Sequence, residues 1–326
     1  MHLRNFFGKL PNELLMMIKE EIPESDLRTH TCFYNACSHF AALYGNERNA
    51  ERFFEKAYIL SGLGLGPDEE PGHISWINLA TRIIRQDGFC DHPECGGTRL
   101  DENAELMLIS EFKPNEPYWS SLNIYGHDED DNLDYPDENE NDLQASLIPN
   151  PLFEHVAFSE QEKKSPEEET FFQYSTGTCA KNTSRLHLHP IATRSFATFP
   201  PVCTAWVVGC DDVVIKPMNK FGLTVWDVVA SMQSKLDTSL QAFAIYNLLD
   251  IDEVDYKEAF PPGCDLKDII HALLTYRRFL THFRWNGLYC DNWVRWPSLY
   301  VLYEVAKQLP TVEEGRKETA PALAST

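Results

Sequence analysis

The feature that most limits how this chain can fold is a run of acidic residues near its middle. Residues 127–142, HDEDDNLDYPDENEND, hold nine acidic side chains and neither Lys nor Arg. Such a segment repels itself and has little apolar surface to bury. A second polar stretch, SEQEKKSPEEE, follows at 159–169. We therefore expect residues 127–170 to form a disordered acidic linker between folded parts.

The net charge of the chain follows the same division. The 326 residues carry a formal charge of −22, from 50 acidic and 28 basic side chains. Residues 101–170 hold 20 of the acidic and 3 of the basic side chains, which leaves 30 acidic and 25 basic for the rest. The remainder is thus close to neutral and has no Lys/Arg cluster, so we do not expect nucleic-acid binding.

Apolar runs and cysteines indicate the compartment. No stretch approaches the 18 or so apolar residues of a membrane span, so we expect no membrane association. The N-terminal MHLRNFFGKLPNELLMM lacks an apolar core before a small-residue cleavage site, so we expect no secretory signal. The nine cysteines are scattered and odd in number, which favours reduced thiols and a cytoplasmic or nuclear location.

Residues 10–60 have the periodicity of α-helices. Leu14, Ile18 and Ile22 recur every four residues and make one apolar stripe. Pro11 suits the first turn of this helix and Pro23 ends it. Further helices are predicted from Ser25, as the cap, to the break at Gly45 and Asn46, then over 48–60 and over 74–87, ISWINLATRIIRQD.

The pattern changes from about residue 185. RLHLH at 185–189 alternates like a strand, and CTAWVVGCDDVVIKP at 203–217 predicts a hairpin. Helices are predicted after Thr224, over 239–249 and over 265–276. Closing strands are predicted over 277–289 and 298–306, with a helix as the alternative for the second of these segments. This order of strands, helices and strands is typical of an α+β fold.

We predict an α+β chain with an all-helical N-terminal unit and a mixed C-terminal domain that contains a small antiparallel sheet. The predicted parts are a helical unit over 1–60, a helical and loop extension with a Cys/His loop over 61–126, the acidic linker over 127–170, the α+β domain over 171–309 and a polar tail over 310–326.

The first fifty residues resemble an F-box. The residues that carry the resemblance are Leu10, Pro11, Glu13, Leu14, Ile18, Ile22, Asp26, Leu27, Cys32 and Phe40. An F-box is a small helical unit that docks on the Skp-type adaptor of a cullin–RING ubiquitin ligase. The resemblance implies that Leu10, Pro11, Leu14, Ile18 and Leu27 face that adaptor. A unit of this size buries only a limited core by itself, so its surplus aliphatic surface suits a partner protein.

Two later segments point to an F-box protein of fungal type. SWINLATRIIRQDGFCDHPECG, at 75–96, resembles F-box-like proteins of mushroom-forming fungi. The stretch 196–232, with Pro-Pro-Val, a strand and then Gly-Leu-Thr-Val opening a helix, resembles a domain of unknown function from the same fungi. Of these resemblances, only the F-box implies a function.

One Cys/His loop is a weak candidate for a metal site. Cys90, His92 and Cys95 are good zinc ligands, but a tetrahedral site needs four and the spacing is not that of paired C-x₂-C knuckles. We favour a tight turn there and expect neither a metal nor a cofactor. His187 and His189 fit a half-exposed strand better than a metal site.

Aromatic side chains are dense over 279–303, and most of them are expected in the core. Arginines lie among them, and aromatic and Arg side chains together suit recognition of a protein partner. The candidates for a substrate-binding surface are Arg278, Arg284, Trp285, Trp293 and Trp296.

The sequence contains no G-x-S-x-G elbow, P-loop, G-x-G-x-x-G or H-E-x-x-H, so we expect no catalytic activity. The hypothesis is a non-catalytic F-box protein that binds a Skp-type adaptor and recruits a protein substrate to a cullin–RING ligase. A standalone scaffold with its N-terminal helices packed internally is the first alternative, and a metal-binding or hydrolytic enzyme is the last.

Overall fold

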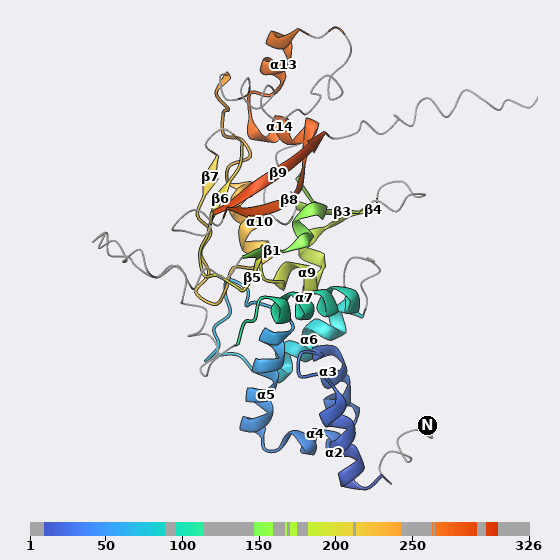
Figure 1. The fold of residues 1–326 in the computed structure, drawn as a ribbon. Coiled ribbons are helices and arrows are strands. Elements are labelled where there is room, and N and C mark those ends of the chain that lie inside the picture. The colour runs from blue at the N-terminus through green and yellow to red at the C-terminus, as the bar shows by residue number, and fades with distance from the viewer. Residues whose placement is uncertain are drawn as a thin grey trace, which may run out of the picture.

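The computed structural model describes residues 10–88, 96–113, 147–158, 167, 170–174, 182–210, 213–242, 245, 263, 265–291 and 298–305. The fold is α+β. The N-terminal helices form one end of an elongated molecule, and the largest sheet lies toward the other end, with α13 beyond it (Figure 1). The acidic run at 127–142, the segment 159–166 and the predicted tail lie outside the described residues.

Within the described residues up to position 113, the N-terminal end is built from seven helical segments. They are α2 (Asn12–Glu21), α3 (Leu27–Ala36), α4 (Ser38–Ala41), the 3₁₀ turn η1 (Ala42–Tyr44), α5 (Glu47–Leu60), α6 (Trp76–Asp87) and α7 (Gly97–Ile109). Side chains cap three of them: Asp26, Asn46 and Ser75 each accept a backbone N–H at a helix start. Asp26 caps α3, which corrects the prediction of Ser25, and α7 was not predicted from the sequence.

The described residues of the C-terminal part form three small sheets. Strands β1 (Ile148–Pro149) and β5 (Thr198–Phe199) pair with each other, and β2 (Val156–Phe158), β3 (Thr170–Tyr174) and β4 (Asn182–Arg185) form a second sheet. The largest has the order β7-β6-β9-β8, from β7 (Val214–Ile215), β6 (Trp206–Val208), β9 (Ser298–Val305) and β8 (Phe283–Asp291). The β6–β9 pair is parallel and the others in this sheet are antiparallel, so the predicted β6–β7 hairpin is confirmed.

In the described part of the chain after residue 147, six short helical segments accompany these strands. They are η3 (Pro151–His155), η4 (Leu186–Leu188), α9 (Pro190–Arg194), α10 (Val225–Gln233), α13 (Leu266–Ala272) and α14 (Tyr276–His282).

Two predicted strands are wrong in part. RLHLH forms η4 and the turn into α9, because Pro190 starts a helix there in place of a continued strand. Residues 277–282 are helical because the side chain of Thr275 accepts the N–H of Arg278 and caps α14. The strand begins only at Phe283.

Most buried apolar side chains of the described residues gather in two hydrophobic clusters. The larger lies between the four-stranded sheet and helices α10 and α14, and it includes Leu152 and Phe153 from η3. The smaller joins α3, α5, α6 and α7 to Ile191, Phe196 and Phe199 of the C-terminal part. The smaller cluster thus contains residues from both sides of position 60, where the predicted helical unit ended. The helical segment after that position packs on the C-terminal part.

Polar contacts reinforce this joint. Asn103 on α7 donates to Ser195 Oγ at 2.8 Å, and the Asn150 amide donates to Phe196 O at 2.8 Å. Arg194 on α9 makes two hydrogen bonds to Glu69, at 2.5 and 2.8 Å. Burial by itself raises the pKa of Glu69, but the bonds and charge of Arg194, with help from Gly66 N–H and Arg82, outweigh it and lower the pKa to about 2.

A candidate protein-binding surface

Helix α2 is defined by the prolines at its two ends. Pro11 is its N-cap, with φ −55° and ψ 144°, and its carbonyl accepts the N–H groups of Leu14 and Leu15. Ile22 is extended at the C-cap, as the residue before Pro23 tends to be. No side chain caps the helix. Its position therefore depends on contacts along its length.

The inner side of α2 is attached by one aliphatic and one cationic side chain. Leu15 is fully buried. The Lys19 ammonium donates to Leu43 O at 3.2 Å and lies 4.6 Å from the ring centroid of Tyr44, over its face. Lys19 thus points toward Leu43 and Tyr44 of this chain, and the opposite side of the helix is exposed to solvent.

The turn after α2 is held by a buried histidine. His30 Nε2 lies 3.1 Å from Pro23 O, and its Nδ1 lies 2.8 Å from the Tyr44 hydroxyl. These two bonds fix Nε2 as the protonated nitrogen of a neutral ring. Burial is the main cause that lowers the pKa of His30, so the neutral form is favoured.

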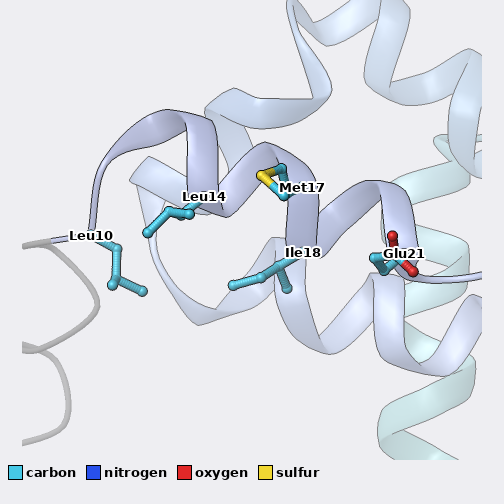
Figure 2. Close-up of a pocket in the computed structure, with 5 residues that line it drawn as sticks. All are labelled: Leu10, Leu14, Met17, Ile18 and Glu21. Carbon is cyan, nitrogen blue, oxygen red and sulfur yellow. The ribbon is translucent and has the colours of Figure 1, made fainter.

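The outer side of α2 is an exposed apolar surface. Leu14, Met17 and Ile18 are 46%, 60% and 45% exposed. Together with Leu10 and Glu21 they line an open pocket of about 410 Å³ (Figure 2). Leu10, Leu14 and Ile18 lie along one side of the ribbon, on successive turns of the chain. We call this set of five residues the α2 surface.

The α2 surface contains most of the residues that the sequence singled out. Leu14 and Ile18 belong to it, Leu10 is half-buried at its edge, and Pro11 is exposed beside it. Leu27 is a correction: it is fully buried in the helical cluster, because it starts α3 directly after its cap and points inward. Met17 was missed, although its spacing of three from Leu14 is the helical signal that marks a shared face.

The predicted substrate residues are scattered. Trp285 is a correction, because it is 1% exposed and its indole N–H donates to Tyr276 Oη inside the larger cluster. Arg278 is exposed on α14. The side chain of Arg284 and the whole of Trp293 and Trp296 lie outside the described residues.

A different set of side chains forms the outer face of the four-stranded sheet. Val207, Leu299 and Val301 point into the core, so the alternation of strands turns their neighbours outward. Trp206, Tyr289 and Leu302 are exposed there, and the rings of Tyr289 and Tyr300 stack at 5.1 Å across β8 and β9. The density of aromatic residues in the sequence over 279–303 did not by itself distinguish the side chains of this exposed face from those of the core.

The described residues contain no cluster of side chains suited to binding a metal ion. Cys90, His92 and Cys95 lie outside them, and within the described ranges no three His, Cys, Asp or Glu side chains gather in a way that could hold a metal ion. His189 is buried beneath η4, where burial and the charge of His187 lower its pKa. No described helix is both long and apolar enough to cross a bilayer.

The strongly perturbed tyrosines are part of the core. The hydroxyls of Tyr276 and Tyr303 lie 2.7 Å apart, and the N–H of Cys210 donates to Tyr303. Burial raises the pKa of both phenols. Tyr276 is fully buried in the larger cluster and Tyr303 packs against that cluster, so we assign this hydroxyl pair to the core.

Comparison of the chain with protein-family models, with curated proteins and with solved structures finds no match in any of the three. The assignment of a function therefore depends on the α2 surface and on the motif in the sequence.

Proposed function

We propose that this protein is a non-catalytic F-box subunit. Its α2 surface binds a Skp-type adaptor, and its C-terminal α+β part recruits a protein substrate to a cullin–RING ubiquitin ligase. The protein itself makes and breaks no covalent bond. It contributes by holding the substrate close to the subunits that transfer ubiquitin.

One observation carries the proposal. The apolar stripe that the F-box resemblance assigns to an adaptor is exposed on the free chain, while its neighbour Leu15 is fully buried. Contiguous apolar surface of this kind marks a protein-interaction site more often than an isolated exposed side chain does. A scaffold with internally packed N-terminal helices would have covered the stripe, so the exposure favours the F-box over that alternative.

The exposed stripe supplies part of the energy of an interface. Complete burial of an exposed Leu, Ile or Met is worth about 1.5–3 kcal/mol, and a half-exposed side chain retains about half of that. Leu14, Met17 and Ile18 would therefore contribute on the order of 3 kcal/mol together. This is about the size of one interface hot spot, so a stable complex needs further contacts around the stripe.

The test is complex formation with a purified Skp-type adaptor. We expect a stable 1:1 complex by size-exclusion chromatography with light scattering. The double variant Leu14→Asp/Ile18→Asp abolishes it, because binding would bury two unpaired carboxylates. The variant itself stays folded, since both side chains already reach solvent.

A matched control uses another exposed apolar pair. Leu108 and Ile109, at the end of α7, are also exposed. The variant Leu108→Asp/Ile109→Asp makes the same chemical change away from α2 and leaves the complex intact. If wild type never binds the adaptor, and Leu14→Asp/Ile18→Asp unfolds the chain, the stripe belongs to an internal core and the scaffold alternative replaces this proposal.

Substrate recruitment is the second half of the proposal. We place it on the outer sheet face, where Trp206, Tyr289 and Leu302 are exposed, and no longer on Trp285. Aromatic side chains with a polar group are common at the centre of protein interfaces. Affinity purification of wild type and of a Trp206→Ala/Tyr289→Ala variant, followed by mass spectrometry, separates the two halves. The adaptor stays with both proteins, and substrates are lost only from the variant.

A further inference from the structure

The α2 surface has charged neighbours that follow a pattern of their own. Helix α2 carries three exposed carboxylates, Glu13, Glu20 and Glu21. Glu21 lies within the pocket, at its C-terminal end. At 100° per residue, Glu13 and Glu20 fall on one side of the helix, next to Met17, whereas Leu15 and Lys19 flank the other edge of the apolar stripe. The apolar stripe is thus bordered by the protein's own core on one side and by acid on the other.

Among the described residues, the basic side chains of α2 and α3 (Lys19 and Arg28) and Lys56 on α5 are engaged elsewhere. Lys19 is directed inward to Leu43 O and the ring of Tyr44. Lys56 pairs with Glu24 at 2.6 Å, and Arg28 pairs with Asp87. Within the described ranges, no ion pair reaches Glu13, Glu20 or Glu21. The outer side of α2 therefore combines an apolar stripe with three carboxylates that have no described cation beside them.

We infer that the partner of the α2 surface is a protein whose apolar groove has Lys or Arg along the rim that meets Glu13, Glu20 and Glu21. This inference rests on the proposed function, and it specifies the adaptor's chemistry at that site. A neutral or acidic rim would leave three carboxylates facing a low-dielectric interface without compensation, which lowers affinity. A basic rim pairs with them and fixes the direction in which the helix enters the groove.

Charges at the rim of an interface act mainly on the association rate, and salt screens them. The discriminating experiment therefore measures association with the purified adaptor by stopped flow, at about 0.02 M and about 0.5 M NaCl. The variant Glu13→Gln/Glu20→Gln/Glu21→Gln removes the charges and keeps the side-chain shapes. We expect it to associate about fivefold more slowly than wild type at low salt and at nearly the same rate at high salt.

A matched control separates the local charge from the net charge. Asp101, Glu105 and Glu111 are exposed on α7 or just after it. The variant Asp101→Asn/Glu105→Gln/Glu111→Gln changes the net charge by the same amount and should keep the wild-type rate within a factor of two. If both triple variants slow association equally, overall charge is responsible and the inference of a basic rim at α2 is overturned.

Other outcomes are equally decisive. Association of the α2 variant at the wild-type rate or faster at low salt means a neutral or acidic rim, and overturns the inference while the F-box proposal stands. An equal loss at both salt concentrations means that the carboxylates act through the helix itself, which also overturns it. If wild type forms no complex at either salt concentration, the proposed function fails and this inference fails with it.

Discussion

Helices α2 and α10 are both short amphipathic helices, of 10 and 9 residues, but the fold treats their apolar stripes in opposite ways. In α10, all four stripe residues (Val225, Val228, Val229 and Met232) are fully buried. In α2, Leu15 alone is buried, and Leu14, Met17 and Ile18 stay in solvent. Hydrophobic periodicity shows that a helix has an apolar side that is stabilised by burial. It does not show whether that side is buried by this chain or by another protein.

The ends of the two helices differ as well. Helix α10 begins with a capping box, in which Thr224 and Asp227 satisfy each other's backbone N–H groups. Asn219 adds a hydrogen bond to Asp227 at 2.8 Å. Helix α2 begins at Pro11 without a side-chain cap. Helix α10 is thus fixed by side chains at its start and along its apolar face, whereas α2 is fixed along its inner side and through the turn that His30 holds after it.

The largest expected effect compares one methionine on each helix. Met232→Ala should lower the free energy of unfolding by about 2–5 kcal/mol, because it leaves a cavity in the larger cluster. Met17→Ala should change it by less than about 0.5 kcal/mol, because that side chain is already in solvent. Urea unfolding followed by circular dichroism measures both. A cost above about 1 kcal/mol for Met17→Ala would show that α2 packs more tightly than its exposure indicates.

The cap gives an intermediate effect. Thr224→Ser keeps the hydroxyl and removes only the methyl group, which is buried and should cost about 0.8 kcal/mol of stability. Thr224→Ala removes the same methyl group and also the acceptor for Asp227 N–H, so it should be less stable than Thr224→Ser by about a further 1 kcal/mol. If both variants are equally stable, the hydroxyl does not hold α10, and the contrast between the two helix ends loses its energetic basis.

The same contrast can be measured in the wild-type protein. Hydrogen exchange of the backbone amides in the first turn should be faster in α2 than in α10.

The smallest expected effect concerns pH and the turn after α2. The folded chain keeps His30 neutral with a lowered pKa, whereas the unfolded chain titrates near the ordinary value of 6.5. As pH falls below 6.5, the unfolded state binds a proton that the folded state does not, so stability decreases. Unfolding free energies at about pH 7.5 and 5.5 measure this loss in wild type and in His30→Gln.

The glutamine cannot titrate, so the pH-dependent loss should be smaller in the variant even if its stability at neutral pH is lower. His189, whose pKa is also lowered, is present in both proteins and cancels from the comparison. An identical pH dependence in the two proteins would remove His30 as the cause. Helix α10 has no histidine in its capping network, so hydrogen exchange of its first turn should not follow this titration.

Local signals predicted the ends of several elements well. Pro11, Pro23, the Gly45-Asn46 break and Thr224 act on the backbone within a few residues, through a fixed φ, a missing N–H or a side-chain acceptor. The helix at 47–60 and the hairpin of β6 and β7 appear where those signals place them. Such effects depend on short-range sterics and hydrogen bonds, and these are the same in any fold.

Other features were outside the reach of periodicity. RLHLH alternates like a strand, but Pro190 and the adjoining core favour a 3₁₀ turn and a helix. Helix α7 carries only a weak stripe, and it is stabilised by contacts such as the Asn103–Ser195 hydrogen bond across 92 residues of chain. Long-range contacts of this kind do not appear in a local pattern.

By itself the sequence determined that the stretch between Pro11 and Pro23 forms a helix with an apolar stripe, since spacing and flanking prolines are local properties. Only the tertiary structure decided which part of that stripe meets this chain. Leu15 is buried against this chain, and Lys19 bonds to Leu43 O. Leu27, which was expected to face a partner, lies in the smaller hydrophobic cluster. Met17 is exposed beside Leu14 and Ile18. The reason is geometric: an exposed face is what remains after every other element has been packed, and no single segment contains that information.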